Sequence, residues 1–318
     1  IWLKSLYFYE NMIATRLVCI KNAKASIRDV LVEKAITWAQ EKHRIKLAEN
    51  QMIAVEMGVS KKIHVITGGP GTGKSTITKA ILSITEKVTD KIYLAAPTGR
   101  AAKRMMEITY KKAFTIHSLL EFDFRSGGFK RNEKNPLKCN LLIIDESSMI
   151  DTLLMYHLLK AIPDYTRIIF IGDIDQLPSV GPGNVLKDMI NSKIITVTYL
   201  DKIFRQSKYS HIVVNAHKIN KGEFPFLNSE DKKSDFFFHE FQEPVDIHDK
   251  IISLLKHELP QNTNFKSLED IQVLSPMKKG IIGIENLNLS LQKALNPSKN
   301  PLVKGGKIND FQLVFCRN

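Results

Sequence analysis

Short runs of consecutive apolar residues alternate with segments of helical periodicity along the first 200 residues. The runs predict strands at 63–67, 91–97, 141–145, 167–172 and 194–199. Between them, the periodic segments predict helices at 76–82, 99–108, 151–161 and 183–190. Strands that are apolar without alternation are buried on both faces, which is typical of a parallel sheet covered by helices on each side. The pattern therefore predicts an α/β fold with a parallel sheet flanked by helices.

The flanking segments follow patterns of their own. Residues 1–48 read mostly as helix, with Val30, Leu31, Ala35 and Trp38 on one face, and a short helix is expected from about 50 to 58. After about residue 200 the alternation restarts, with strands expected at 235–239 and 270–274 and helices at 209–220, 246–257 and 283–295. We therefore divide the chain into an N-terminal helical segment at 1–48, a first α/β domain at 49–200 and a second, incomplete α/β domain at 201–318.

The charge balance adds a class of partner to this picture. The 318 residues carry a formal net charge of +13, which suits a polyanion such as nucleic acid, although a lysine-rich solvated surface would give the same excess. Cys19, Cys139 and Cys316 lack CxxC spacing, so neither a zinc site nor a disulfide framework is indicated. No apolar run is long enough to cross a bilayer, and no signal peptide is visible. We therefore expect a cytoplasmic protein without a membrane partner.

One glycine-rich stretch, 68–75, carries the strongest chemical signal. It follows the apolar run 63–67 and opens a helix, which is the context that a P-loop requires. Glycine lets the backbone curl so that successive N–H groups point at phosphate oxygens, and the start of the helix favours the anion further. Lys74 would bind the β- and γ-phosphates, and the Ser75 hydroxyl would ligate Mg²⁺. The expected binding residues are Gly69, Pro70, Gly71, Thr72, Gly73, Lys74, Ser75 and Thr76.

Further polar residues follow neighbouring strands. Asp145 ends a buried strand and can hold Mg²⁺, while Glu146 beside it can polarise an attacking water. Two adjacent carboxylates repel each other unless a cation lies between them, so a purely structural role for the pair is unfavourable. Gln176, in the turn after another strand, is suited to sensing the γ-phosphate or to orienting water. Because ligands of parallel sheets bind beyond the carboxyl ends of the strands, we expect these side chains beside the P-loop.

Taken together, these segments resemble the superfamily 1 DNA helicases, and most closely their RecD-like branch. The resemblance runs from about residue 10 to about residue 297. The motifs occur in the family's order, at 68–76 (motif I), 96–102 (Ia), 115–120 (a DNA-contacting element), 145–149 (II), 172–181 (III) and 199–206 (IV). The family's motifs V and VI, which add a second γ-phosphate arginine, would lie beyond Asn318. The resemblance thus describes the chain as a fragment that ends before them.

This resemblance assigns further roles. It implies a RecA-like ATP-binding domain at 49–200 and a second, partial RecA-like domain after it. Gln51 would read the adenine, although its spacing alone favours a surface glutamine of a helix. Arg205 would reach the γ-phosphate from the second domain. Thr98, Arg100 and His117 would make phosphate and stacking contacts with single-stranded DNA.

The function implied is that of an ATP hydrolase, a DNA helicase that uses ATP and Mg²⁺ to move 5′ to 3′ along single-stranded DNA in recombination or repair. Other subunits of a nuclease and helicase complex are implied as further partners. Two alternatives stay open. A P-loop ATPase that does not act on nucleic acid would hydrolyse ATP regardless of added DNA. A catalytically silent nucleic-acid-binding subunit, or a truncated remnant, would bind nucleotide without turnover. Whether the 318 residues are active alone is equally open.

Overall fold

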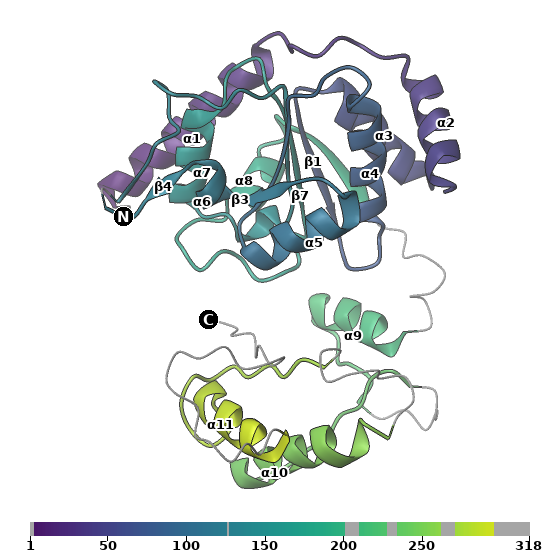
Figure 1. Cartoon of the computed structure of the whole chain (residues 1–318), viewed down its shortest axis with the longest axis vertical. Helices are drawn as coiled ribbons and strands as arrows, with labels where there is room; N and C mark the ends of the chain where they lie inside the picture. Colours follow the sequence, from purple (N-terminus) through teal and green to yellow (C-terminus); the bar gives the residue numbers. More distant parts are fainter. Residues whose placement is uncertain (1–2, 126, 201–209, 228–233, 262–270, 296–318) are drawn as a thin grey trace. The chain divides into compact units, whose positions relative to one another are not determined.

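A six-stranded parallel sheet forms the centre of the first part of the chain in the computed structural model (Figure 1). The structure describes residues 3–125, 127–200, 210–227, 234–261 and 271–295. The chain divides into a first compact unit, residues 1–226 with 231–236, and a second unit, residues 227–230 with 237–318. The domain boundaries expected at residues 48 and 200 stay predictions.

The sheet has the strand order β3-β2-β6-β7-β1-β8. Its strands are β1 (Ile63–Gly68), β2 (Ile92–Ala96), β3 (Ala113–Thr115), β6 (Leu141–Ile144), β7 (Arg167–Gly172) and β8 (Thr196–Leu200). A separate antiparallel pair joins β4 (Phe122–Asp123) to β5 (Gly128–Phe129). All six strands of the sheet run in the same direction, so their carboxyl ends meet at one edge. The prediction of an α/β fold with a parallel sheet is confirmed.

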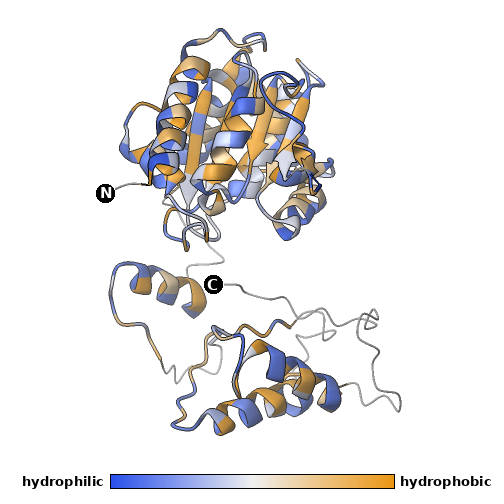
Figure 2. Cartoon of the chain, turned by 90° about the vertical axis from the view of Figure 1, so that its left-hand side faces the viewer, coloured by the Kyte–Doolittle hydropathy of each residue, from blue (hydrophilic) through white to orange (hydrophobic). Residues whose placement is uncertain are grey.

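Each central strand contributes side chains to two separate cores. In β6, Leu142 and Ile144 face one core, whereas Leu141 and Ile143 face the other. One face is covered by α1 (Lys4–Asn22), α6 (Ile116–Leu119), α7 (Thr152–Ala161) and α8 (Val185–Asn191). The opposite face is covered by α2 (Val32–His43), α3 (Glu49–Ser60), α4 (Lys74–Thr85) and α5 (Gly99–Thr109). Figure 2 shows the hydrophobic residues concentrated along the strands, which explains the unbroken apolar runs in the sequence.

The N-terminal segment differs in detail from its prediction. It contains α1 and α2, which are separated by an irregular stretch at 23–31. Leu31 lies before α2 as its N-cap and is exposed, so the expected stripe with Val30 is not a single helical face. The buried face of α2 is instead formed by Ile36 and Ala39. In the described part of the chain, no helix combines the length and the apolar composition needed to cross a bilayer.

After residue 200, the regular secondary structure of the described residues is helical. The helices are α9 (His211–Asn220), α10 (Pro244–Ser253), which continues as a π-helical turn (Leu254–Glu258), and α11 (Ile284–Leu295). These confirm the three predicted helices. The strand predicted at 235–239 is wrong, and so is the strand at 270–274 over its described residues 271–274. Phe237 is 71% exposed, and an apolar run without a neighbouring strand leaves its backbone groups unpaired. A second RecA-like domain therefore remains a prediction.

Candidate functional site

The P-loop connects the carboxyl end of β1 to the first turn of α4. Gly71 and Gly73 have φ angles of 76° and 88°, a left-handed conformation that favours glycine. Gly68 is needed for space, because a Cβ there would lie 2.7 Å from Leu200 Cβ and 2.9 Å from Thr72 Oγ1. The Thr72 hydroxyl in turn donates a hydrogen bond to Gly69 O at 2.8 Å. The glycine spacing therefore follows from the backbone conformation and from close packing.

The Lys74 ammonium group lies inside the loop. It donates hydrogen bonds to Gly68 O and, at 3.0 Å, to Gly69 O. Burial lowers its pKa, while the carboxylates of Asp173, Glu146 and Asp145 act in the opposite direction. The positive charge of Lys74, which would meet a triphosphate, thus already interacts electrostatically with three carboxylates. Ser75 and Thr76 follow in the first turn of α4, where both are half-buried.

Asp145 and Glu146 follow directly after β6. Asp145 N–H donates to Ala95 O on β2 at 2.9 Å, and its Oδ1 accepts the Glu146 N–H at 2.9 Å. Glu146 has a φ of 51°, an uncommon conformation for a residue other than glycine and one that is frequent at functional sites. Burial raises the pKa of both carboxyl groups, and the charge of Asp145 raises that of Glu146 further. A cation between them would offset this cost.

The residues after β7 divide between the interior and the surface. Asp173 is buried, and its Oδ1 accepts the Asp175 N–H at 3.0 Å, so it shapes the turn as well as facing Lys74 electrostatically. Gln176 is exposed and lines a small cavity of about 170 Å³. Ser147 Oγ donates to Ile171 O at 2.8 Å and so ties the segment after Asp145 to β7.

Gln51 occupies a place that its spacing in the sequence does not reveal. Its side chain is only 3% exposed. Nε2 donates to Thr72 O in the P-loop at 3.0 Å, and Oε1 accepts the Ala48 N–H at the start of α3 at 3.0 Å. The interpretation as a surface glutamine is therefore wrong. In this structure Gln51 links α3 to the P-loop, and an adenine-reading role stays a prediction.

The expected DNA-contacting residues lie after β2 and β3, at the same edge of the sheet. Thr98 Oγ1 accepts the Ala101 N–H at 3.3 Å and caps α5, and Arg100 is exposed in the first turn of that helix. His117 is exposed on α6, and its ring lies 5.8 Å from Phe122 and 5.7 Å from Phe129. Arg205 lies outside the described residues.

The structure adds two features that the residue types alone do not single out. Arg104, on α5, is close enough to lower the pKa of Asp145 and Glu146, and it follows Arg100 by one helical turn. The ring of Phe122 lies 5.1 Å from those of both Phe124 and Phe129, and Phe124 is 91% exposed. In the sequence, the i, i+4 spacing of two arginines is the signal for Arg104. The group of aromatic residues after 115–120 is the signal for the cluster around Phe122.

The site can hold a triphosphate and a hard cation. Loop N–H groups and the Lys74 ammonium group are suited to phosphate. The Ser75 hydroxyl and the Asp145 carboxylate are oxygen donors of the kind that Mg²⁺ takes together with phosphates and water. Among the described residues no cluster of three or more His, Cys, Asp or Glu side chains could hold a metal ion by itself. The Ser75 and Asp145 oxygens are thus of the kind that hold Mg²⁺ together with the phosphates of a nucleotide.

Comparisons with known proteins give relatives among the DNA helicases. A family model described as an AAA domain matches residues 51–182. The ATP-dependent RecD2 DNA helicase of Deinococcus radiodurans is 36% identical over 263 residues, which are 82% of this chain and 34% of that protein. The RecBCD enzyme subunit RecD of Buchnera aphidicola subsp. Schizaphis graminum is 28% identical over 325 residues, 81% of this chain and 53% of that protein. The chain thus spans between a third and about half of the length of these curated relatives.

The structure of the Pif1 helicase from Candida albicans is 22% identical and matches 65% of this chain and 54% of that chain, with a TM-score of 0.45.

Proposed function

This chain is a homologue of the RecD-like DNA helicases along most of its length, and we propose that it carries the ATP-binding part of an ATP-dependent DNA helicase. The observation that supports this most strongly is the convergence of Lys74 with Asp145, Glu146 and Asp173 at the carboxyl edge of the sheet. A glycine-rich loop alone would bind phosphate, but the carboxylates add groups for hydrolysis. That the whole protein acts as an ATP-dependent DNA helicase is part of the same proposal.

Within the site each residue has a distinct task. Lys74 and the loop N–H groups hold the β- and γ-phosphates, and they stabilise the negative charge that develops during phosphoryl transfer. Ser75 and Asp145 would hold Mg²⁺, which supplies further charge neutralisation when bound. Glu146 accepts a hydrogen bond from the attacking water and orients it. Gln176 would sense the γ-phosphate, and Arg205 would add the arginine that the family places opposite it.

The proposed path for single-stranded DNA lies beside the nucleotide, over α5 and α6. Arg100 would pair with a phosphate, and Thr98 would place the start of α5 toward the backbone of the strand. His117, backed by Phe122 and Phe129, offers a ring on which a base can stack. Because α5 also carries Arg104, a movement of this helix on DNA binding would change the charge beside Asp145. This would link the DNA site to ATP hydrolysis.

Finer parts of the proposal rest on the likeness to the RecD-like helicases. One relative is named a subunit of the RecBCD enzyme, so we propose that other subunits of a nuclease and helicase complex are partners of this protein as well. Movement in the 5′ to 3′ direction, a role in recombination or repair, and a cytoplasmic location complete the proposal.

The test is ATP hydrolysis with and without single-stranded DNA, on the 318-residue chain and on the full-length gene product that contains it. We expect DNA to stimulate turnover in the full-length protein, and Lys74→Ala to abolish that turnover. Lys79→Ala, which removes a lysine five residues further along α4, is the matched control and should leave it unchanged. Turnover that is indifferent to DNA would favour an ATPase that does not act on nucleic acid. Nucleotide binding without turnover would favour a silent binding subunit.

A further inference from the structure

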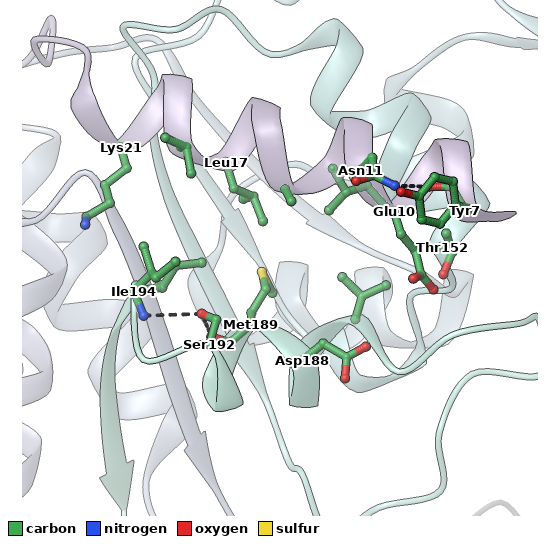
Figure 3. A pocket seen from close by; sticks show the side chains of 15 residues that line it. Tyr7, Glu10, Asn11, Leu17, Lys21, Thr152, Asp188, Met189, Ser192 and Ile194 are labelled. Carbon is green, nitrogen blue, oxygen red and sulfur yellow. Dashed lines mark hydrogen bonds between the residues drawn. The ribbon is translucent and has the colours of Figure 1, made fainter. Parts of the chain in front are cut away.

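A second concave site lies on the sheet face opposite α4, between α1 and α8 (Figure 3). It has a volume of about 600 Å³, and α1 lines it from Tyr7 to Lys21. At about 1.5 Å per residue, this part of α1 forms a wall about 20 Å long. Apolar side chains, among them Leu17 and Met189, line most of the groove. None of the P-loop residues contributes to it, so it is separate from the nucleotide site.

The wall formed by α1 has the spacing of a helix–helix seam. Tyr7, Asn11, Ala14, Val18 and Lys21 line the groove at intervals of four and three residues, the repeat by which one helix packs along another. This seam adjoins the side of α1 that carries its buried residues, two of which also line the groove. Ala14, a small residue, lies in the middle of the seam and would let a second helix approach closely. Unlike a fully packed helix, α1 therefore presents two faces suited to packing.

Large apolar side chains of the groove remain in contact with water. Tyr7 is 61% exposed, Ile194 is 52% exposed and Val18 is 43% exposed. Scattered exposed apolar residues are ordinary, but three of them around one concave site form a patch typical of a binding surface. Burying this patch against another apolar surface would be favourable.

The groove also has a charge pattern. The amide of Asn11 donates to Tyr7 O at 2.7 Å, and the Ser192 hydroxyl donates to Met189 O at 2.7 Å, so these polar groups have partners within the chain. Figure 3 shows Glu10 and Asp188 in one half of the groove and Lys21 at the other end. Within the described ranges neither carboxylate takes part in an ion pair. Burial, together with the charge of Asp188, raises the pKa of Glu10, as expected for two carboxylates that lack a cation.

We propose that this groove is a docking site for an amphipathic helix of a partner protein. Its apolar face would lie between α1 and α8, and a Lys or Arg near one end would pair with Glu10 and Asp188. An acidic residue about three turns further along would pair with Lys21, since Glu10 and Lys21 are three turns apart on α1. The seam spacing and the length of the groove favour a helix, while the two charged ends fix its direction.

The test uses two fluorescently labelled synthetic helical peptides. Both carry leucine at intervals of three and four residues; one has lysine near its first turn and glutamate eleven residues later, and the other has glutamine at both of these positions. Binding to the 318-residue chain is measured by fluorescence anisotropy. We expect the charged peptide to bind at least about tenfold more tightly than the neutral peptide. The double variant Glu10→Gln with Asp188→Asn should reduce this preference.

A steric variant and its control complete the test. Ala14→Arg, which places a long side chain on the seam, should weaken binding at least about tenfold, whereas Thr15→Arg on the neighbouring exposed position should not. Equal unfolding midpoints of the two variants would show that the fold is intact. Equal binding of the charged and the neutral peptide that Ala14→Arg leaves unchanged would overturn the proposal, as would the absence of binding by either peptide. Self-association of the chain that Ala14→Arg abolishes would assign the groove to a second copy instead.

Discussion

The hydrogen bonds of Gln51 allow a test of what holds the P-loop in place. In Gln51→Met the side-chain volume is nearly kept, but the bonds to Thr72 O and from Ala48 N–H, both 3.0 Å long, are lost. A buried polar group left unpaired costs about 1–3 kcal/mol. The Ala48 N–H is half-buried and can find water more easily, so we expect the free energy of unfolding to fall by about 2–4 kcal/mol in total. The urea midpoint should then fall by roughly 1 M.

Gln40→Met is the matched control for this change. Gln40 Oε1 accepts the Leu47 N–H at 2.8 Å, but the residue does not contact the P-loop. Gln40→Met should lower the free energy of unfolding by about 1 kcal/mol, as expected for one hydrogen bond, and should leave nucleotide affinity unchanged. Gln51→Met should weaken the binding of both ATP and inorganic tripolyphosphate, since the loop itself would be less well held.

Calorimetric titration of the two ligands separates two roles of Gln51. If Gln51 only reads the adenine, Gln51→Met weakens ATP binding and leaves tripolyphosphate binding as it was. That result would refute the role of Gln51 in holding the loop. An unchanged urea midpoint would refute the energetic reasoning as well.

Three further predictions concern charge. Asp145→Asn should abolish ATP turnover and yet raise the urea midpoint at pH 7 by a few tenths of a molar unit, because burial disfavours the carboxylate; a lower midpoint would contradict this. Arg104→Ala should raise the pKa of Asp145 further, so the acidic limb of the pH profile of turnover should shift to higher pH. Lys103→Ala should leave this profile unchanged. Equal profiles for the wild type and both variants would exclude a role for Arg104. Burial lowers the pKa of His64 to about 4. The free energy of unfolding should therefore keep its full value above pH 6.5 and should decrease by about 3 kcal/mol as the pH falls toward 4. Urea unfolding at several pH values should show this loss in the wild type and less of it in His64→Gln; identical losses would contradict the assignment.

The sequence predicts the first unit well because its strands are buried on both faces. Runs such as 141–144 and 168–172 have no polar positions that would suggest another structure. The short strand β3 (Ala113–Thr115) was not predicted, because three residues after two lysines do not form a recognisable apolar run. At 235–239 the same reasoning gave a wrong strand. A run of phenylalanines favours a strand only if other strands pair with it, and pairing cannot be read from the run itself.

The candidate site follows the same division. The P-loop and Asp145-Glu146 are contiguous motifs, so their chemistry is visible in the sequence, and strand order then brings them together. The link from Gln51 to Thr72 and the approach of Arg104 to Asp145 depend on how α3 and α5 pack on the sheet. Twenty-one residues separate Gln51 from Thr72, and no local pattern encodes a contact over that distance. Contacts of this kind required the structure.

The central claim, that the protein is an ATP-dependent DNA helicase, is tested most directly by strand displacement. The substrates are two partial duplexes of the same sequence, one with a 5′ single-stranded tail and one with a 3′ tail, and the full-length gene product is compared with its Lys74→Ala variant in the presence of ATP and Mg²⁺. We predict displacement of the strand from the 5′-tailed duplex, none from the 3′-tailed duplex, and none with Lys74→Ala. Displacement from the 3′-tailed duplex alone would contradict the proposed direction. The absence of ATP-dependent displacement from either substrate, or displacement that survives Lys74→Ala, would contradict the helicase function itself.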